Sequence, residues 1–258
     1  MAKRRISTAQ RRHQDYLRRK GLKVGAVYEG RLARARAHEV KRVLEICRDY
    51  YDPAQWPLVI QDSIDETGYL PKWWRGLFAD AGLPMCRSTA RDLNQAKAAE
   101  DDDLWLDALE DYARERAGNN IVIVSDTLRD SLIEILQEEL QADLTVGVEK
   151  LTKRIYAKYQ SIAKWQVRRI AQTETMISMA DAANVAAGTL DIAFTKQWCV
   201  SGLGNTRDSH LLMDGVEVDQ DEPFTLEGGQ MMYPHDTSMG ALASEIINCA
   251  CSCIRIPK

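Results

Sequence analysis

The sequence lacks a long apolar run and a secretion signal. No stretch approaches the roughly 18–20 apolar residues that a membrane span requires. The basic N-terminus continues into the polar segment STAQRRHQ, where a secretory signal would need an apolar region. We therefore expect the protein to stay in a reducing cytoplasm, where its six cysteines are free thiols or metal ligands rather than disulfides.

Common catalytic motifs are also missing. The chain has no Walker loop, no G-x-S-x-G, no H-E-x-x-H, and neither the H-x-E nor the P-C-x-x-C of zinc deaminases. A cysteine–histidine nucleophile pair would need a spatial proximity that spacing does not reveal, and no flanking motif supports one. The sequence therefore predicts a protein without enzymatic activity and without catalytic residues. An enzyme that uses His210 and a cysteine is the alternative.

Positive charge is concentrated at the N-terminus. Residues 1–50 contain 15 Lys/Arg and 5 Asp/Glu, whereas residues 51–258 contain 19 and 33, which together give the net charge of −4. Residues 1–23 have few apolar anchors, so we expect them to be mobile or ordered only by a partner. The basic side chains either form a solvated face or contact DNA phosphates. The candidate DNA-binding residues are Lys3, Arg4, Arg5, Arg11, Arg12, Arg18, Arg19 and Lys20.

Composition and periodicity divide the chain into four consecutive segments. Residues 1–50 form a basic arm with a helix in its second half. Residues 51–120 hold four of the seven prolines and many aromatic residues, which predicts short helices and turns. Residues 121–189 form a helical bundle and residues 190–258 a small α+β unit. The predicted fold class is α+β, mostly helical, with short antiparallel strands near the C-terminus.

Glycines and aromatic residues indicate where the helices end. The piece PKWWRGLFADAGLP should end near Gly82, and the acidic-capped helix of AEDDDLWLDALEDYARERAG should end near Gly118. We expect further breaks at Gly147 and in residues 159–165. Beyond these helices, the segments DIAFTKQWCV, GVEV and CIRI are typical of strands, with a short helix that ends at Met213.

His210 and three alternating cysteines near the C-terminus are candidate metal ligands. Zinc favours four Cys or His ligands in a tetrahedron. In an extended strand Cys249, Cys251 and Cys253 would lie on one face but too far apart for one ion, so only a turn at residues 248–251 would bring two of them together. The alternative is that the cysteines are small buried apolar residues and the histidine a hydrogen-bonded core residue.

A series of short segments stands out in the C-terminal part of the chain. In order, they are AQTET (171–175), KQW (196–198), TRDSHLLMDG (206–215), DEPF (221–224), MYP (232–234) and INCAC (247–251). This ordered series resembles the head-morphogenesis family of tailed-phage minor capsid proteins, the Mu F-like type. The resemblance covers residues 150–254, whereas residues 1–120 carry no motif that we assign to a family.

The resemblance implies a structural zinc site. In many members of the family the segment that matches RDSH reads C-x-x-C and the later segment reads C-x-C, which resembles a zinc knuckle. Here Arg207 and His210 stand at the two positions of the C-x-x-C pair. The implied zinc ligands are His210, Cys249, Cys251 and Cys253, with Asp208 or Cys199 as further candidates to complete the tetrahedron.

A metal-free link between the same two segments is equally consistent with the residues. We call this link the staple: a set of hydrogen-bonded and packed side chains that holds the short helix against the terminal strand. The residues assigned to the staple are Trp198, Arg207, Asp208, His210 and Asn248.

The family resemblance also implies a place in the virion. It predicts a minor head protein associated with the portal vertex that acts in head assembly and in DNA packaging or ejection. Its partners would be the portal protein, other capsid components and packaged double-stranded DNA, without a membrane. It would be found in the phage head, and in the host cytoplasm during assembly. Some members carry a toxin domain after this unit, and because this chain stops at Lys258 no such activity is expected. A free-standing nucleic-acid-binding protein is the alternative.

Overall fold

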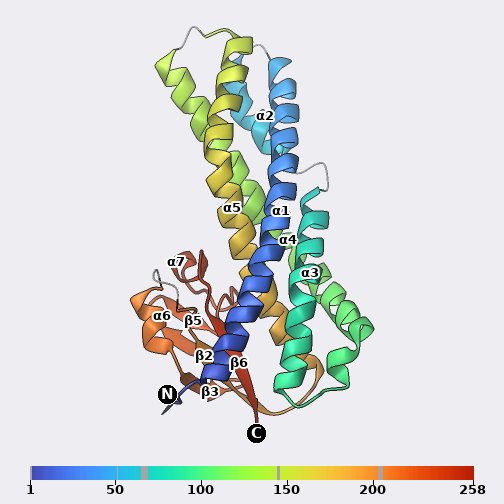
Figure 1. Ribbon diagram of the computed structural model, residues 1–258. Helices are drawn as coiled ribbons and strands as arrows, with labels where there is room; N and C mark the ends of the chain where they lie inside the picture. Colours follow the sequence, from blue (N-terminus) through green and yellow to red (C-terminus); the bar gives the residue numbers. More distant parts are fainter. Residues whose placement is uncertain (1, 51, 65–68, 144–145, 203–205) are drawn as a thin grey trace. The chain divides into compact units, whose positions relative to one another are not determined.

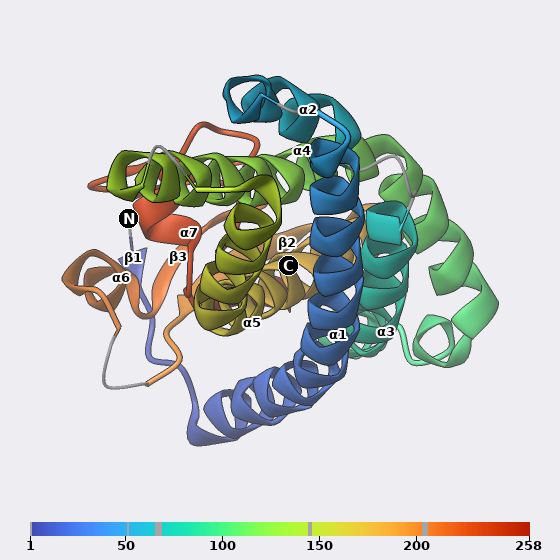
Figure 2. The same cartoon turned by 90° about the horizontal axis from the view of Figure 1, so that it is seen from above.

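The computed structural model consists of long helices and short strands (Figure 1; Figure 2). It describes residues 2–50, 52–64, 69–143, 146–202 and 206–258, and the side chains of residues 2, 69, 70 and 114–125 lie outside the described part. The helices are α1 (Thr8–Arg48), α2 (Trp56–Ser63), α3 (Tyr69–Asp92), α4 (Asp102–Ala142), α5 (Val148–Thr189), α6 (Asp208–Met213) and α7 (Ala243–Ile246), with 3-10 turns at Pro53–Gln55 and Ala98–Glu100. The strands are β1 (Ala2–Lys3), β2 (Phe194–Cys199), β3 (Val216–Asp219), β4 (Phe224–Leu226), β5 (Gly229–Met231) and β6 (Ser252–Pro257).

The predicted α+β fold class is confirmed. Long helices dominate the chain, and all strands except β1 follow α5. All the strand pairs, including that of β1 with β3, are antiparallel. The three strands expected from the sequence correspond to β2, β3 and β6, whereas the β4–β5 hairpin has too few residues to produce a recognisable alternation. Of the helices that the structure describes, none has the length and apolar character needed to cross a membrane.

The chain forms two compact units, each assembled from stretches that are distant in sequence. Unit 1 contains Met1–Ala26, Gly76–Arg114 and Ala171–Lys258, and unit 2 contains Val27–Arg75 and Glu115–Ile170. Helices α1, α3, α4 and α5 each contribute residues to both units. This division differs from the four consecutive segments expected from composition, because composition compares neighbours along the chain and compactness depends on which helices pack together.

Unit 2 has a hydrophobic core built from four helices. Helices α1, α2, α4 and α5 bury apolar side chains that recur every three or four residues, the spacing that places them on one helix face. Two stripes visible in the sequence lie in this core: Val40, Val43, Leu44 and Cys47 of α1, and Leu128, Leu132, Ile135 and Leu136 of α4.

The basic N-terminal segment is an ordered part of unit 1. Helix α1 begins at Thr8 and contains the rest of this segment. The apolar side chains of Ile6, just before the helix, and of Leu17 are buried. At Gly25 the helix comes so close to α5 that a Cβ atom would lie 2.7 Å from Oγ1 of Thr175. The expectation that residues 1–23 become ordered only with a partner is therefore wrong, because their apolar residues suffice to pack one face of a helix.

Helix α3 does not end near Gly82 as expected but continues through Pro84 to Asp92. Gly82 marks a close contact between helices: a Cβ atom built there would lie 2.8 Å from Cβ of Ala182 in α5. The same residue type serves helix ends and close helix packing. The expected end at Gly82 is wrong because the sequence does not distinguish the two uses.

Replacing Gly82 with alanine should destabilise the protein by about 1–2 kcal/mol. Overpacking of this kind costs about 1–3 kcal/mol, which outweighs the roughly 0.5–1 kcal/mol that alanine gains over glycine inside a helix. Chemical denaturation measures the difference. Gly188 of α5 has no atom of the described residues within 4 Å of a built Cβ, so Gly188→Ala is the control and should be neutral or slightly stabilising. Equal stabilisation by both changes would contradict tight packing at Gly82.

Helices α4 and α5 are continuous at two of the expected breaks. Helix α4 passes Gly118 and ends at Ala142, and α5 runs unbroken through residues 159–165. The chain does leave the helical conformation just before Gly147, as predicted. Tyr159 is buried in the core of unit 2 and provides packing surface there, whereas Trp165 is half exposed, and neither residue ends the helix.

A four-stranded antiparallel sheet in unit 1 supports the candidate site. Its order is β1-β3-β2-β6, and β2 pairs with β6 from Phe194 opposite Pro257 to Cys199 opposite Ser252. Because side chains alternate along a strand, neighbouring residues of β2 join different clusters. Cys199 packs with Ile6 and Ile254, whereas Trp198 packs with Val216, Val218 and Ile177 of α5.

Candidate metal centre

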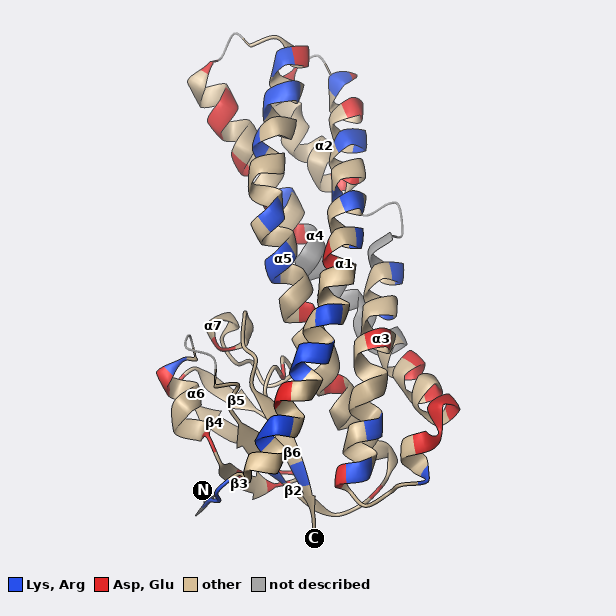
Figure 3. Ribbon diagram, viewed as in Figure 1, with Lys and Arg blue, Asp and Glu red and all other residues tan. Residues whose placement is uncertain are grey.

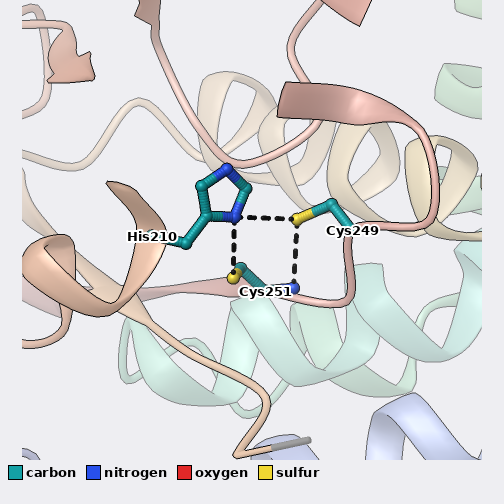
Figure 4. A group of neighbouring side chains, drawn as sticks. All are labelled: His210, Cys249 and Cys251. Carbon is teal, nitrogen blue, oxygen red and sulfur yellow. Dashed lines mark hydrogen bonds between the residues drawn. The ribbon is translucent and has the colours of Figure 1, made fainter. Parts of the chain in front are cut away.

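Two short segments of unit 1 carry the side chains of the candidate centre. Arg207 is extended (φ −65°, ψ 149°) and α6 follows it, with His210 buried in the helix. The second segment follows α7. Asn248 has a φ of 57°, a left-handed conformation that asparagine adopts more readily than most residues. This turn places both Cys249 and Cys251 toward His210 (Figure 4).

His210, Cys249 and Cys251 form a buried group of three potential metal ligands. Nδ1 of His210 lies 3.5 Å from Sγ of Cys249 and 3.4 Å from Sγ of Cys251 (Figure 4). The three ligand atoms all lie within 4.8 Å of one another. Zinc bonds of ordinary length at a tetrahedral angle separate nitrogen from sulfur by about 3.5 Å, so the observed N–S spacing matches that of ligands around one ion. This group can hold a metal ion.

Glu245 of α7 orients the ring of His210. Its Oε2 atom lies 2.7 Å from Nε2 of His210 and accepts a hydrogen bond from Oγ of Ser209 at 3.0 Å. Because the carboxylate accepts, Nε2 carries the hydrogen and Nδ1 keeps a lone pair that faces the thiols. Metal-binding histidines commonly donate their second ring nitrogen to a carboxylate in this way. The sequence analysis missed Glu245, since no motif marks a glutamate four residues before a cysteine.

Glu245 is buried and closely packed against Gly228. The side chain is 8% exposed, and a Cβ atom at Gly228 would lie 2.6 Å from Cγ of Glu245. A buried carboxylate is costly unless it is hydrogen-bonded or paired. The ring of His210 and the hydroxyl of Ser209 supply these hydrogen bonds, so the position of Glu245 depends on α6.

Hydrogen bonding between the two cysteines makes their sulfur atoms unequal. A hydrogen bond with Cys251 lowers the pKa of Cys249, and the positive charge of Arg207 lowers it further, while burial acts in the opposite direction. The pKa of Cys251 is raised by the same hydrogen bond and by burial. The thiolate is the form that binds metals. Binding of a divalent ion would therefore displace the remaining proton, so that metal affinity falls as the solution becomes more acidic.

Three residues of the staple meet in the structure. A guanidinium nitrogen of Arg207 donates to the carbonyl oxygen of Ile247 at 2.5 Å, which ties the start of α6 to the segment that carries the cysteines. The rings of Trp198 and His210 meet edge to face, with 5.4 Å between their centroids. The Arg207 contact and the ligand group join α6 to the cysteine segment, and Trp198 supports His210 from strand β2.

Two residues assigned to the staple do not belong to it through their side chains. Asp208 and Asn248 are both exposed. Asn248 contributes through its backbone, which makes the left-handed turn and donates to Oγ1 of Thr173 at 3.3 Å. Asp208 and Asn248 were assigned to the staple because they are polar and lie next to its other residues in the sequence.

Cys253, an expected zinc ligand, does not lie in the ligand group of the described residues. It belongs to strand β6 and is opposite Trp198, with its Sγ 3.9 Å from the carbonyl oxygen of Ile254. Cys251 precedes β6 and faces His210, whereas Cys253 lies within the strand and outside the ligand group. Cys199 packs in the other cluster of the sheet, with Ile254.

Most of the candidate DNA-binding residues are exposed. They lie along the N-terminal half of α1 and the residues before it (Figure 3), and we call them the basic face. The exposed members are Lys3, Arg4, Arg5, Arg12, Arg19 and Lys20. Arg11 and Arg18 have partners within the protein instead. Arg11 binds both carboxylate oxygens of Asp214, at 2.5 and 3.2 Å, and Arg18 donates to the carbonyl oxygen of Ser201 at 2.6 Å.

Comparison with known proteins gives one partial similarity to report. No family model matches the chain, and no solved structure matches it significantly. The chain is 34% identical over 111 residues to the NAD(+)–arginine ADP-ribosyltransferase EFV of Enterococcus faecalis. This stretch covers 38% of the present chain and 22% of that enzyme, so the chain spans about a fifth of its relative. The similarity to an enzyme contradicts the sequence-based prediction of a protein without enzymatic activity.

Proposed function

We propose that this chain is a minor head protein of a tailed phage, associated with the portal vertex and acting in head assembly and in DNA packaging or ejection. One observation supports the proposal most. The resemblance has its two cysteine pairs in the segments TRDSHLLMDG and INCAC, and the structure brings His210 of the first segment against Cys249 and Cys251 of the second. A coincidental match of short motifs would not require these segments to meet.

The ion that we propose for the centre is zinc. Two thiolates and an imidazole are a common zinc ligand set, and the group is closed off from solvent as in structural sites. His210, Cys249 and Cys251 would hold the ion, and Glu245 would keep His210 in the required tautomer. A zinc ion would cross-link α6 to the start of β6. Its binding free energy would stabilise a region whose strands are only three to six residues long.

The location can be tested on purified particles. Mass spectrometry should detect this chain in proheads or mature particles, and particles assembled without the portal protein should lack it. Cryo-electron microscopy of the same particles should place the chain at the portal vertex. Particles that contain the other head proteins but never this chain would overturn the proposal.

The exposed basic face of α1 should bind double-stranded DNA without sequence preference. For B-DNA the slope of log K against log salt is about −0.9 per neutralised phosphate. Changing Arg5, Arg12, Arg19 and Lys20 to glutamate should therefore weaken binding strongly and flatten the slope. Arg11 and Arg18 are left unchanged because they stabilise the fold. Fluorescence anisotropy at several salt concentrations measures both quantities.

A matched control separates this face from the effect of net charge. Arg34, Lys41, Lys72 and Arg75 are exposed residues of unit 2, and their change to glutamate alters the net charge equally. The control variant should keep most of the affinity. Equal losses in the two variants, or no measurable binding by the folded protein, would favour a merely solvated face.

The partial similarity to the ADP-ribosyltransferase EFV gives a second candidate function, the transfer of ADP-ribose from NAD(+) to arginine. The shared stretch is 22% of that transferase, so it either carries catalytic residues or accompanies them. Incubation of the purified chain with labelled NAD(+) and arginine distinguishes these cases. Transfer of label would assign the activity to this chain. If an active transferase transfers label in the same assay and this chain does not, the shared stretch belongs to a non-catalytic part of the transferase.

A further inference from the structure

A tetrahedral zinc site needs one more ligand than the three-residue group supplies. The residues suggested by the sequence do not provide it. Cys253 lies within β6 and outside the ligand group, Asp208 is exposed, and Cys199 packs in the other cluster of the sheet. The structure offers a different residue, His235, from the segment between β5 and α7.

The backbone of His235 has a conformation that is unusual for histidine. Its φ of 75° lies in the left-handed region, which glycine and asparagine adopt much more readily than residues with bulky side chains. Its side chain is 1% exposed. Strained backbone of this kind persists where surrounding contacts hold it and is concentrated at functional sites. The surrounding contacts must therefore hold the backbone of His235 in this conformation.

The hydrogen bond of His235 fixes its tautomer. Nε2 lies 3.1 Å from the carbonyl oxygen of Cys251. A carbonyl only accepts, so Nε2 carries the hydrogen and Nδ1 carries the lone pair. This Nδ1 atom is buried and has no hydrogen-bond partner in the part of the chain that the structure describes.

His210 has the same arrangement. Its Nε2 atom donates to an oxygen of Glu245, and its Nδ1 atom presents a lone pair to the two thiols. Both histidines are thus buried and have an oxygen partner at Nε2, so that Nδ1 is the ring nitrogen turned away from that oxygen. An oxygen partner at one ring nitrogen is the usual support of a histidine that binds metal through the other.

We propose that Nδ1 of His235 is the fourth ligand of a Cys2His2 zinc centre with His210, Cys249 and Cys251. The proposal rests on the zinc occupancy proposed above. The ring is bonded to the backbone of Cys251 but lies outside the group whose ligand atoms are within 4.8 Å of one another. Zinc binding would therefore draw His235 toward the other three ligands. Two cysteines and two histidines are a common ligand set of structural zinc.

The test begins with the unmodified protein, loaded with one equivalent of zinc or of cobalt(II). X-ray absorption should count two sulfur and two nitrogen ligands, and cobalt should give the intense visible absorption of a tetrahedral site. His235→Gly suits the left-handed backbone, so the variant should fold. It should bind zinc at least tenfold more weakly, with an oxygen in place of one nitrogen. His235→Asn, which also tolerates this conformation, should behave in the same way.

Asn94→Gly is the matched control. Asn94 is an exposed residue that follows the C-terminal end of α3 and also has a left-handed backbone, with a φ of 62°. It should leave zinc affinity unchanged. A protein that binds no zinc would overturn the zinc centre and this proposal together. Zinc held by two sulfurs and one nitrogen, with the same affinity in His235→Gly, would overturn the role of His235 alone. Neither result depends on where the chain is located in a particle.

Discussion

With the proposed zinc ion bound, purified His210→Ala protein should lose the ion and unfold partly within residues 190–258. The substitution removes the nitrogen that faces both thiols, and it leaves the buried carboxylate of Glu245 without the ring that it binds. The ligands come together only in the folded chain, so the free energy of metal binding also stabilises the fold. Elemental analysis measures the zinc, and limited proteolysis with mass spectrometry locates the unfolded part.

The same substitution has a smaller expected effect if the group holds no metal. It should then cost about 1–3 kcal/mol, the penalty for leaving a buried polar group without its partner. Added zinc raises the melting temperature of the unmodified protein only if the centre binds it. His38→Ala removes an exposed histidine of unit 2 and should change neither zinc content nor stability. An unchanged zinc content in His210→Ala would contradict the centre.

Glu245→Gln should lower the zinc affinity about 10–100-fold, the usual effect of removing the carboxylate behind a metal-binding histidine. Glutamine has nearly the same shape, so the packing against Gly228 is retained. The amide holds the tautomer and orientation of the His210 ring less firmly than the carboxylate does. Competition with a chromophoric chelator measures the affinity of the folded variant.

Glu227→Gln is the matched control for this prediction. Glu227 is exposed, so the substitution removes the same charge from the surface of the same region. Its zinc affinity should equal that of the unmodified protein within about twofold, since exposed charges are largely screened by water and salt. If Glu245→Gln also retained full affinity, the carboxylate would have a purely structural role.

Periodicity predicted the helical regions well, and glycine predicted the helix ends poorly. The stripes that contain Val43 and Leu132 lie in the core of unit 2, because a 3.6-residue repeat is a property of the chain itself. Gly82 and Gly118 both lie inside helices. Whether a glycine ends a helix or permits close packing depends on the neighbouring helix, which no local stretch of sequence contains.

The candidate site was predictable only where a motif marked it. The turn at Asn248 and the approach of His210 to Cys249 agree with the two segments that the sequence singled out. Glu245 and His235 were not predictable. Each matters because of a partner more than fifteen residues away, at separations of 35 residues for Glu245 and 16 for His235. Burial of such polar residues becomes visible only in three dimensions.

Unit 1 joins residues that leave the ribosome at very different times. Arg11 binds Asp214 across 203 residues, and the side chain of Gln197 donates to the carbonyl oxygen of Arg4 across 193. At about 5–20 residues per second, translation separates Arg11 from Asp214 by about 10–40 s. Unit 2 is fully synthesised once Ile170 has been added, before most of unit 1 exists. Unit 2 can therefore be complete before unit 1, whose N-terminal part of α1 has to stay without the partners that residues 171–258 supply until these are synthesised.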